Sequence, residues 1–423
     1  MNRIIITILF SVLLQAEISG QELIREILDF GASDYSQLIE NEYALESEIY
    51  RNDYGLSFNV SAQHRFGEGF IEADLTENNA QTFYKAGFSW NLLKGGWYQN
   101  QSKADQLDLQ AKLEAINSEK ESKGRAYYAQ YSLTAYLYDK LLLDVYLSRE
   151  ELLKTKQRVF SSLREEGYFT NQEVLELEKR RNEVSFQTKN ISQSNQAFSS
   201  IFGNPLIFSK DEETEIPVIS ISGILVDIDK SLILKSSLDA KKAINGEFAF
   251  WTEEVSINAS LNYNHQVSFI DSRRDFVSAG VSISVPIHRN TGLKKQRYQL
   301  SNKKIDEEHF YLVVNLKKEL LMLFQEYVYK EKQLANIIST TKILREKFRV
   351  QQIHKQSMNS ELPATDASLL QDDLLSLKIE EISLRKQMMQ ILLKMNVLLP
   401  DNEITHYLEY TSPTLLSEVE EVK

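Results

Sequence analysis

The chain has 423 residues, no cysteine and a formal net charge of −12, with a sequence pI near 5.2. The absence of cysteine excludes disulfides, thiolate metal sites and an acylated amino-terminal cysteine as a lipid anchor. The acidic balance argues against a nucleic-acid partner, because nothing in the chain compensates the repulsion of phosphates.

The first element is a predicted export signal at residues 1–20. Arg3 supplies its positive charge, residues 4–14 its apolar core, and Ala16 or Gly20 a small residue for cleavage. The apolar run is too short to span a bilayer as a helix, and no later segment offers about 18 uninterrupted apolar residues. We therefore expect an exported chain that can enter a membrane only as β-strands.

Two strands are predicted next, at 56–63 and 84–92. In each, apolar side chains alternate with polar ones that are almost all uncharged. One face carries β-branched and aromatic residues suited to lipid, and the other carries hydroxyl and amide groups suited to a water-filled lumen. The alternative is a soluble antiparallel sheet whose apolar face packs on a core.

A long helix is predicted from about 97 to 166, a stretch with no proline and one interior glycine, Gly124. Its apolar stripe has the four-and-three spacing of a coiled-coil seam. That stripe is Tyr127, Tyr131, Thr134, Tyr138, Leu141, Val145, Ser148, Leu152, Thr155 and Val159. A second stripe from Val174 to Ile191 predicts a returning helix, and hence an antiparallel helical hairpin. An elongated cytosolic coiled coil is the alternative for an isolated stripe.

The second half of the chain repeats this order of elements. Gly87 and Gly280 are 193 positions apart, and so are Glu173 and Asp366. A fixed period of this size indicates a duplicated architecture. The second copy has predicted strands at 255–264 and 277–287, and coiled-coil stripes at 313–348 and 370–395.

Four such strands cannot close into a barrel within one chain. An open sheet in lipid leaves unpaired backbone groups, each of which costs several kcal/mol, so the edge strands must join those of other chains. Two chains would give eight strands with an interior filled by side chains, whereas three would give twelve and leave a channel. We therefore infer a trimer.

Taken together, this order and spacing resemble the TolC-like outer-membrane efflux proteins over nearly the whole mature chain. The resemblance is carried by segments 86–90 and 279–283, which lead into the long helices, by 166–169 and 173–175 at the first tip, and by 370–398. It implies a mainly α fold with β-structure, in which a β-hairpin and a long coiled-coil helical hairpin occur twice. It further implies a homotrimer with a 12-stranded barrel and an α-helical periplasmic tunnel.

The resemblance also implies how the chain divides. The segments are a signal peptide at 1–20, an N-terminal equatorial segment and helix at 21–53, a first β-hairpin at 54–92, a first helical hairpin at 93–202, an inter-repeat equatorial segment and helix at 203–253, a second β-hairpin at 254–288, a second helical hairpin at 289–398 and a C-terminal equatorial segment at 399–423.

The implied function is that of an outer-membrane exit duct with a periplasmic helical extension. Such a duct docks to a periplasmic adaptor protein and an inner-membrane transporter. In a tripartite efflux or type I secretion system it passes small molecules or proteins out of the periplasm without doing chemistry. The alternative from another class is a surface-anchored structural or adhesive coiled-coil protein.

Carried over by position, the tip glycine of the family matches Gly167, and the acids of its periplasmic aperture match Glu173 and Asp366. Three copies of an acid at a narrow mouth form a ring that favours cations. The alternative is that each carboxylate caps its helix and interacts favourably with the helix dipole. Gly167 has its own alternative, as an ordinary helix C-cap.

The predicted adaptor-contact tips are Gly167, Tyr168, Phe169 and Ser360. Ser360 is a departure, because the family has glycine there. The other constricting residues of the family, a tyrosine, an arginine and a second aspartate, correspond to Ser357, Leu362 and Leu369, so most of that closing network is missing.

Aromatic residues Trp90, Trp97 and Tyr98 flank the change from strand to helix and are predicted membrane-interface residues. Ordinary packing at a domain junction is the alternative. The six histidines are scattered, and no nucleophile elbow, phosphate loop or dinucleotide motif occurs, so neither an enzyme nor a cofactor is expected. Acidic pairs such as Asp372-Asp373 are interpreted as solvated helix faces.

Overall fold

In the computed structural model of the chain, the residues described are 20–31, 36–64, 80–165, 170–203, 216–247, 255–268, 273–285, 291–357 and 364–411. They belong to two compact units. The first unit is formed by 1–33, 120–231 and 313–423, and the second by 34–119 and 232–312. Of the predicted signal, only Gly20 is described, and the rest lies outside the described residues.

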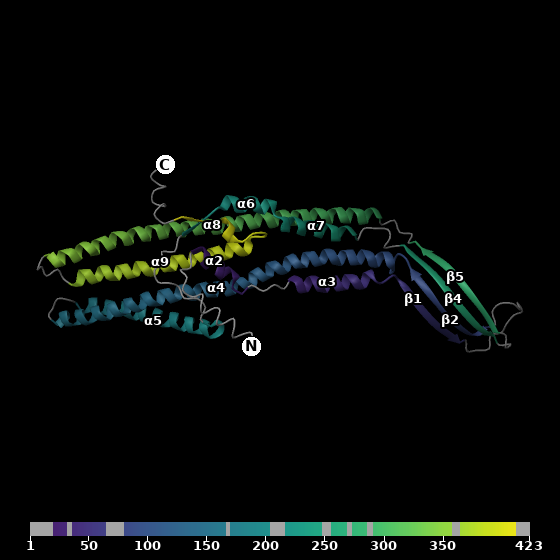
Figure 1. Cartoon of the computed structure of the whole chain (residues 1–423), viewed down its shortest axis with the longest axis horizontal. Coiled ribbons are helices and arrows are strands. Elements are labelled where there is room, and N and C mark those ends of the chain that lie inside the picture. The colour runs from purple at the N-terminus through teal and green to yellow at the C-terminus, as the bar shows by residue number, and fades with distance from the viewer. Residues whose placement is uncertain are drawn as a thin grey trace. The chain divides into compact units, whose positions relative to one another are not determined.

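The second unit contains one four-stranded antiparallel sheet in the order β1-β2-β4-β5 (Figure 1). Its strands are β1 (Leu56–His64), β2 (Ala80–Asn91), β4 (Ser256–Ser268) and β5 (Arg273–Ser284). Both predicted hairpins are therefore confirmed. Pairing of β2 with β4 joins them, which places the two repeats in one sheet and leaves β1 and β5 as its edges.

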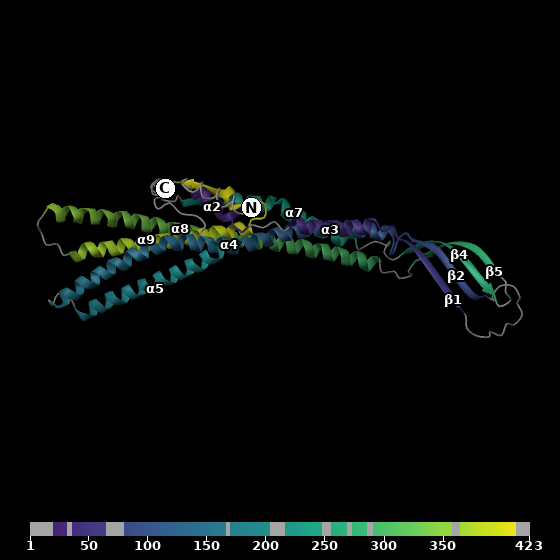
Figure 2. The same ribbon diagram turned by 60° about the horizontal axis from the view of Figure 1, so that its bottom comes forward.

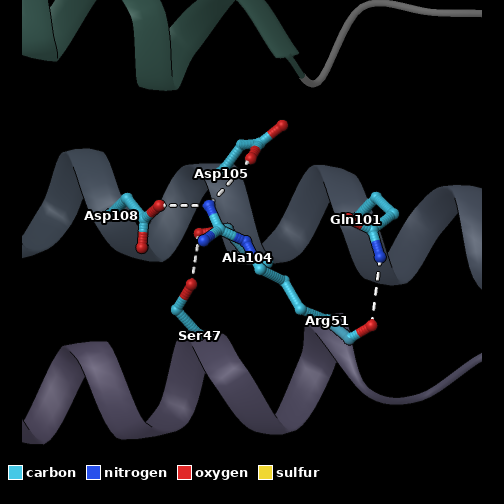
Figure 3. Close-up of polar contacts among 6 residues, drawn as sticks. All are labelled: Ser47, Arg51, Gln101, Ala104, Asp105 and Asp108. Carbon is cyan, nitrogen blue, oxygen red and sulfur yellow. Dashed lines mark hydrogen bonds and ion pairs between the residues drawn. The ribbon is translucent and has the colours of Figure 1, made fainter.

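In the same unit, a short helix precedes each hairpin and packs along the start of a long one. These helices are α3 (Ser36–Arg51) with α4 (Trp97–Glu165), and α7 (Leu232–Glu247) with α8 (Thr291–Ser357). Arg51, the last residue of α3, contacts Asp108 at 2.5 Å and Asp105 at 3.4 Å (Figure 3). In the second repeat, Lys242 of α7 contacts Asp306 of α8 at 2.5 Å. In both repeats, a cation on the helix before the hairpin thus contacts an acid near the start of the long helix that follows the hairpin.

In the first unit, the long helices continue and each runs beside a returning helix (Figures 1 and 2). The returning helices are α5 (Asn171–Phe202), beside α4, and α9 (Ala364–Leu398), beside α8. The predicted stripe of α8 is confirmed, since Leu320, Tyr327 and Leu334 are at most 1% exposed. None of the described helices combines the length and apolar composition needed to cross a membrane.

The predicted stripe of α4 is wrong by one position over its second half. Thr155 and Val159 are exposed, whereas Leu153 and Lys156 are buried. Leu153 forms a small core with residues of α5, and Lys156 lies against a carboxylate of α9. The buried face of α4 includes Lys156, so a pattern of apolar residues alone predicts the neighbouring face of the helix instead.

Segments from before, between and after the repeats meet in the first unit. They are α2 (Gly20–Asp29), β3 (Ile216–Ile219), α6 (Ile221–Lys230), the 3₁₀ helix η2 (Ile404–Tyr407) and β6 (Leu408–Thr411). Strands β3 and β6 pair in antiparallel fashion, and both α2 and α6 contact η2. Tyr327 of α8 donates a hydrogen bond to the carbonyl oxygen of Pro217 at 2.6 Å, and Tyr407 donates one to Asp227 at 2.8 Å.

Candidate functional site

The register of the four strands places like side chains in rows across the sheet. Side chains two positions apart on a strand point to the same face, so one face collects all the apolar rows. Two of these rows are Phe58, Phe88, Leu261 and Ala279, then Val60, Ala86, Tyr263 and Val277. The apolar alternation predicted for each strand is therefore combined into one continuous surface.

That apolar face is bare in a single chain. Val60 is 71% exposed, Val281 is 70% exposed and Phe88 is 52% exposed. Every residue of β1 is exposed. A soluble sheet would bury such a face on a core, and an uncovered apolar surface of this extent is typical of a membrane or partner interface. The alternative of a soluble sheet packed on its own core is therefore disfavoured.

The opposite face is mainly polar, although Phe83 and Phe276 also lie on it, and its polar side chains bond to one another. The Ser57 and Ser89 hydroxyls lie 2.6 Å apart across the β1–β2 pair, and the Asn59 amide donates to the Ser89 hydroxyl at 2.9 Å. On the β4–β5 pair, the Asn264 amide donates to the Ser278 hydroxyl at 3.0 Å. These groups form a hydrogen-bonding surface that suits water.

Gly87, at the centre of the repeated Ala-Gly motif, lies under the side chain of Asn262. A Cβ at position 87 would lie 2.4 Å from both Asn262 Oδ1 and the Leu261 carbonyl oxygen, closer than real contacts allow. Glycine therefore lets β4 carry an amide on this face where it pairs with β2. In the second copy, a Cβ on Gly280 would be 3.6 Å from the Ser260 hydroxyl, so the steric demand there is weaker.

The predicted interface aromatics lie where the sheet gives way to helix. Trp90 donates its indole N–H to the carbonyl oxygen of Tyr54 at 2.9 Å, and Trp97 and Tyr98 begin α4 with exposed rings. At the other end of the apolar face, Tyr84 and Tyr263 are half exposed. The sequence pattern marks these two only as strand residues. They differ from the other strand residues because they lie at the border of the apolar rows, and only the strand register shows this.

Of the residues predicted for the adaptor-contact tips and the periplasmic aperture, only Glu173 has a described side chain. Gly167, Tyr168, Phe169 and Ser360 lie outside the described residues, and Asp366 is placed only by its backbone, in the first turn of α9. Glu173 lies in the first turn of α5, where it forms a capping box with Thr170. The structure therefore shows the capping role that was the alternative for Glu173.

The capping box is reciprocal. The Thr170 amide and hydroxyl both donate to the Glu173 carboxylate at 2.8 Å, and the Glu173 amide donates to the Thr170 hydroxyl at 3.3 Å. The bond from the Thr170 backbone holds the pKa of Glu173 below its usual value, and the hydroxyl bond adds to this effect. The pKa of Glu173 is lower in the folded protein than in the unfolded chain. The ionised carboxylate therefore stabilises the folded state above the unfolded pKa, and this stabilisation is lost as pH falls through the folded pKa.

Replacing Thr170 with alanine should loosen the start of α5, because the Glu173 amide loses its acceptor. Such caps contribute about 1 kcal/mol, so hydrogen exchange at the Glu173 amide should become about fivefold faster. In the unchanged protein, acidification through the folded pKa of Glu173 should loosen the same turn. Exchange measured by mass spectrometry after Thr155→Ala is the control, since the Thr155 hydroxyl donates to the Glu151 carbonyl oxygen within α4. Equal exchange at the Glu173 amide in the wild type, Thr170→Ala and Thr155→Ala would contradict the capping role.

A buried ionic cluster links the two helical hairpins. Asp372 of α9 lies 2.8 Å from Arg149 Nε and 4.0 Å from Lys156 Nζ of α4, and its side chain is 7% exposed. Burial lowers the pKa of Lys156, and the charge of Asp372 opposes this shift. A second link joins Lys386 of α9 to Asp139 of α4 at 2.7 Å. The interpretation of Asp372 as part of a solvated face is therefore wrong.

Among the residues that the structure describes, no group of three or more histidine, aspartate or glutamate side chains is arranged to hold a metal ion.

Neither a protein-family model nor a curated protein matches the sequence. Solved structures do match. A membrane protein from Pseudomonas aeruginosa has a TM-score of 0.62 at 12% identity, with 90% of this chain and 93% of that chain covered.

Two further matches are described as outer-membrane channels. The CmeC channel of Campylobacter jejuni has a TM-score of 0.61 at 10% identity, with 97% of this chain and 93% of that chain covered. The MtrE channel of Neisseria gonorrhoeae has a TM-score of 0.60 at 13% identity, with 90% and 89% covered. The resemblance to TolC-like proteins is thus confirmed at the level of the fold, with a helical region and a sheet in one chain.

Proposed function

We propose that three copies of this chain form a channel in the outer membrane. The observation that carries the proposal is the four-stranded sheet, which is apolar and bare on one face, polar on the other, and open at both edges. In lipid, open edges leave backbone groups without partners, so β1 of one copy must pair with β5 of the next. The fold shared with known outer-membrane channels supports this reading.

Three copies supply twelve strands, enough to enclose water, whereas eight strands leave an interior that side chains fill. The polar rows then face the lumen and the apolar rows face lipid. Trp90, Trp97 and Tyr98 would lie at one membrane interface, where aromatic rings are favoured. Each copy also contributes the hairpins α4–α5 and α8–α9 to a helical tunnel in the periplasm.

The channel is proposed to be a passive exit duct of a tripartite efflux or type I secretion system. A periplasmic adaptor protein would dock at the tips, through Gly167, Tyr168, Phe169 and Ser360, and an inner-membrane transporter would supply the energy. Glu173 and Asp366 would line the periplasmic aperture, where a ring of carboxylates favours cations. The capping bonds of Glu173 do not prevent this, because its carboxylate remains exposed. On this proposal the chain is not an enzyme and uses no cofactor.

The proposal is tested by purifying the protein from outer membranes in detergent, measuring its oligomer mass and reconstituting it in a planar bilayer. We expect a trimer that passes ions. A monomer that carries no current would contradict the proposal, and would favour the alternative of a surface-anchored structural or adhesive coiled-coil protein.

A further inference from the structure

The polar face of the sheet carries two cations and no carboxylate within the described strands. They are Lys85 on β2 and Arg274 on β5, and every other described strand residue on this face is uncharged. Both side chains are exposed. In the proposed channel this face lines the lumen, so the charges that a solute meets on the described strand residues there are positive.

The register brings these two cations to neighbouring rows. Lys85 pairs with Asn264, and Arg274 pairs with Gln266, two positions further along the same strand β4. The rows are therefore separated by about 7 Å along the strands. Both rows lie in the half of the sheet away from α4.

The nearby acid of the strands lies on the other face. Asp275 follows Arg274 directly, so its side chain points to the apolar side, where it contacts His265 Nδ1 at 2.5 Å. Arg273 is also on that side, in the row of Val267. The two adjacent arginines of β5 thus carry the same charge on opposite faces.

We propose that Lys85 and Arg274 form a cationic collar in the lumen that draws anionic solutes through the outer end of the barrel. The inference rests on the proposed three-copy channel, in which the collar has six positive charges. Rings of lysine and arginine select anions in pores, because a low-dielectric wall focuses their field into the water-filled lumen. The channel would then have acids at its periplasmic aperture and cations at its exit.

The test is the reversal potential of single channels in a planar bilayer under a tenfold KCl gradient. In the double variant Lys85→Gln with Arg274→Gln, the ratio of chloride to potassium permeability should fall by roughly twofold or more. The difference should grow at lower salt, because the Debye length rises from about 3 Å at 1 M to about 10 Å at 0.1 M. Arg274→Lys should keep the wild-type ratio, since it keeps the charge.

The matched control is Arg273→Gln, which removes an identical charge one position away on the apolar face. Its permeability ratio should equal that of the wild type. Equal shifts in Arg273→Gln and Arg274→Gln would overturn the collar, and so would an unchanged ratio in a double variant that still conducts. A wild-type protein that carries no current would instead overturn the proposed function itself.

Discussion

Arginine in place of Leu261 is expected to prevent assembly in the membrane. Leu261 lies in the middle of the apolar rows, between Phe88 on β2 and Ala279 on β5. A charged side chain at the bilayer midplane costs a β-barrel about 2–4 kcal/mol, and three copies would carry it at once. The variant should therefore be lost from the outer-membrane fraction and degraded.

Ser260→Arg is the control, because Ser260 precedes Leu261 and points to the polar face, opposite Ser89 and Gly280. Arginine there would lie in water, so the trimer should form and its conductance should fall. Both variants are compared by the amount of protein in purified outer membranes. If the serine variant is lost and the leucine variant accumulates, the two faces have been assigned the wrong way round.

Asp372→Ala is expected to destabilise the helical part of the protein strongly. Removing one partner of a buried ion pair typically costs 3–5 kcal/mol, because the remaining charge stays buried without compensation. The charges left behind are those of Arg149 and Lys156, whose side chains are 20% and 4% exposed. The midpoint of thermal unfolding of the detergent-purified protein, followed by circular dichroism at a helix wavelength, should fall clearly.

Asp373→Ala supplies the control, since this neighbouring carboxylate is exposed and its loss should change the midpoint little. A triple variant, Asp372→Leu with Arg149→Met and Lys156→Met, should regain much of the lost stability, because apolar groups can replace a buried ion cluster at little cost. An Asp372→Ala protein as stable as Asp373→Ala would show that the cluster is solvated in the assembled protein.

Much of the fold could be predicted because its patterns are local. Alternation of side chains along β1 and β5 predicts strands, and the stripe from Leu320 to Leu334 predicts the buried side of α8. A repeat of 193 positions then predicts that both halves share one plan. Each of these signals arises from residues close together in the chain, and long proline-free stretches leave the helices uninterrupted.

The contacts that could not be predicted depend on residues far apart in sequence. Asp372 is adjacent to an exposed aspartate, and its burial follows only from Arg149 and Lys156, more than 200 positions earlier. The difference between the predicted and the observed buried face of α4 has the same cause, because Lys156 is buried against Asp372. Likewise, the shared face of Lys85 and Arg274 follows only from the pairing of β2 with β4, which joins the two repeats.

The most direct test of the three-copy channel is disulfide cross-linking between the two sheet edges, in a chain with no native cysteine. Asn59→Cys on β1 is combined in turn with Ser278→Cys, Ser282→Cys or Ser284→Cys on β5. Within one chain these edges are three strand spacings apart, about 14 Å, which exceeds the roughly 7 Å limit for a disulfide. We predict that oxidation of at least one pair in membranes gives a covalent trimer that single-cysteine variants cannot form. Monomers alone from every pair would contradict the account.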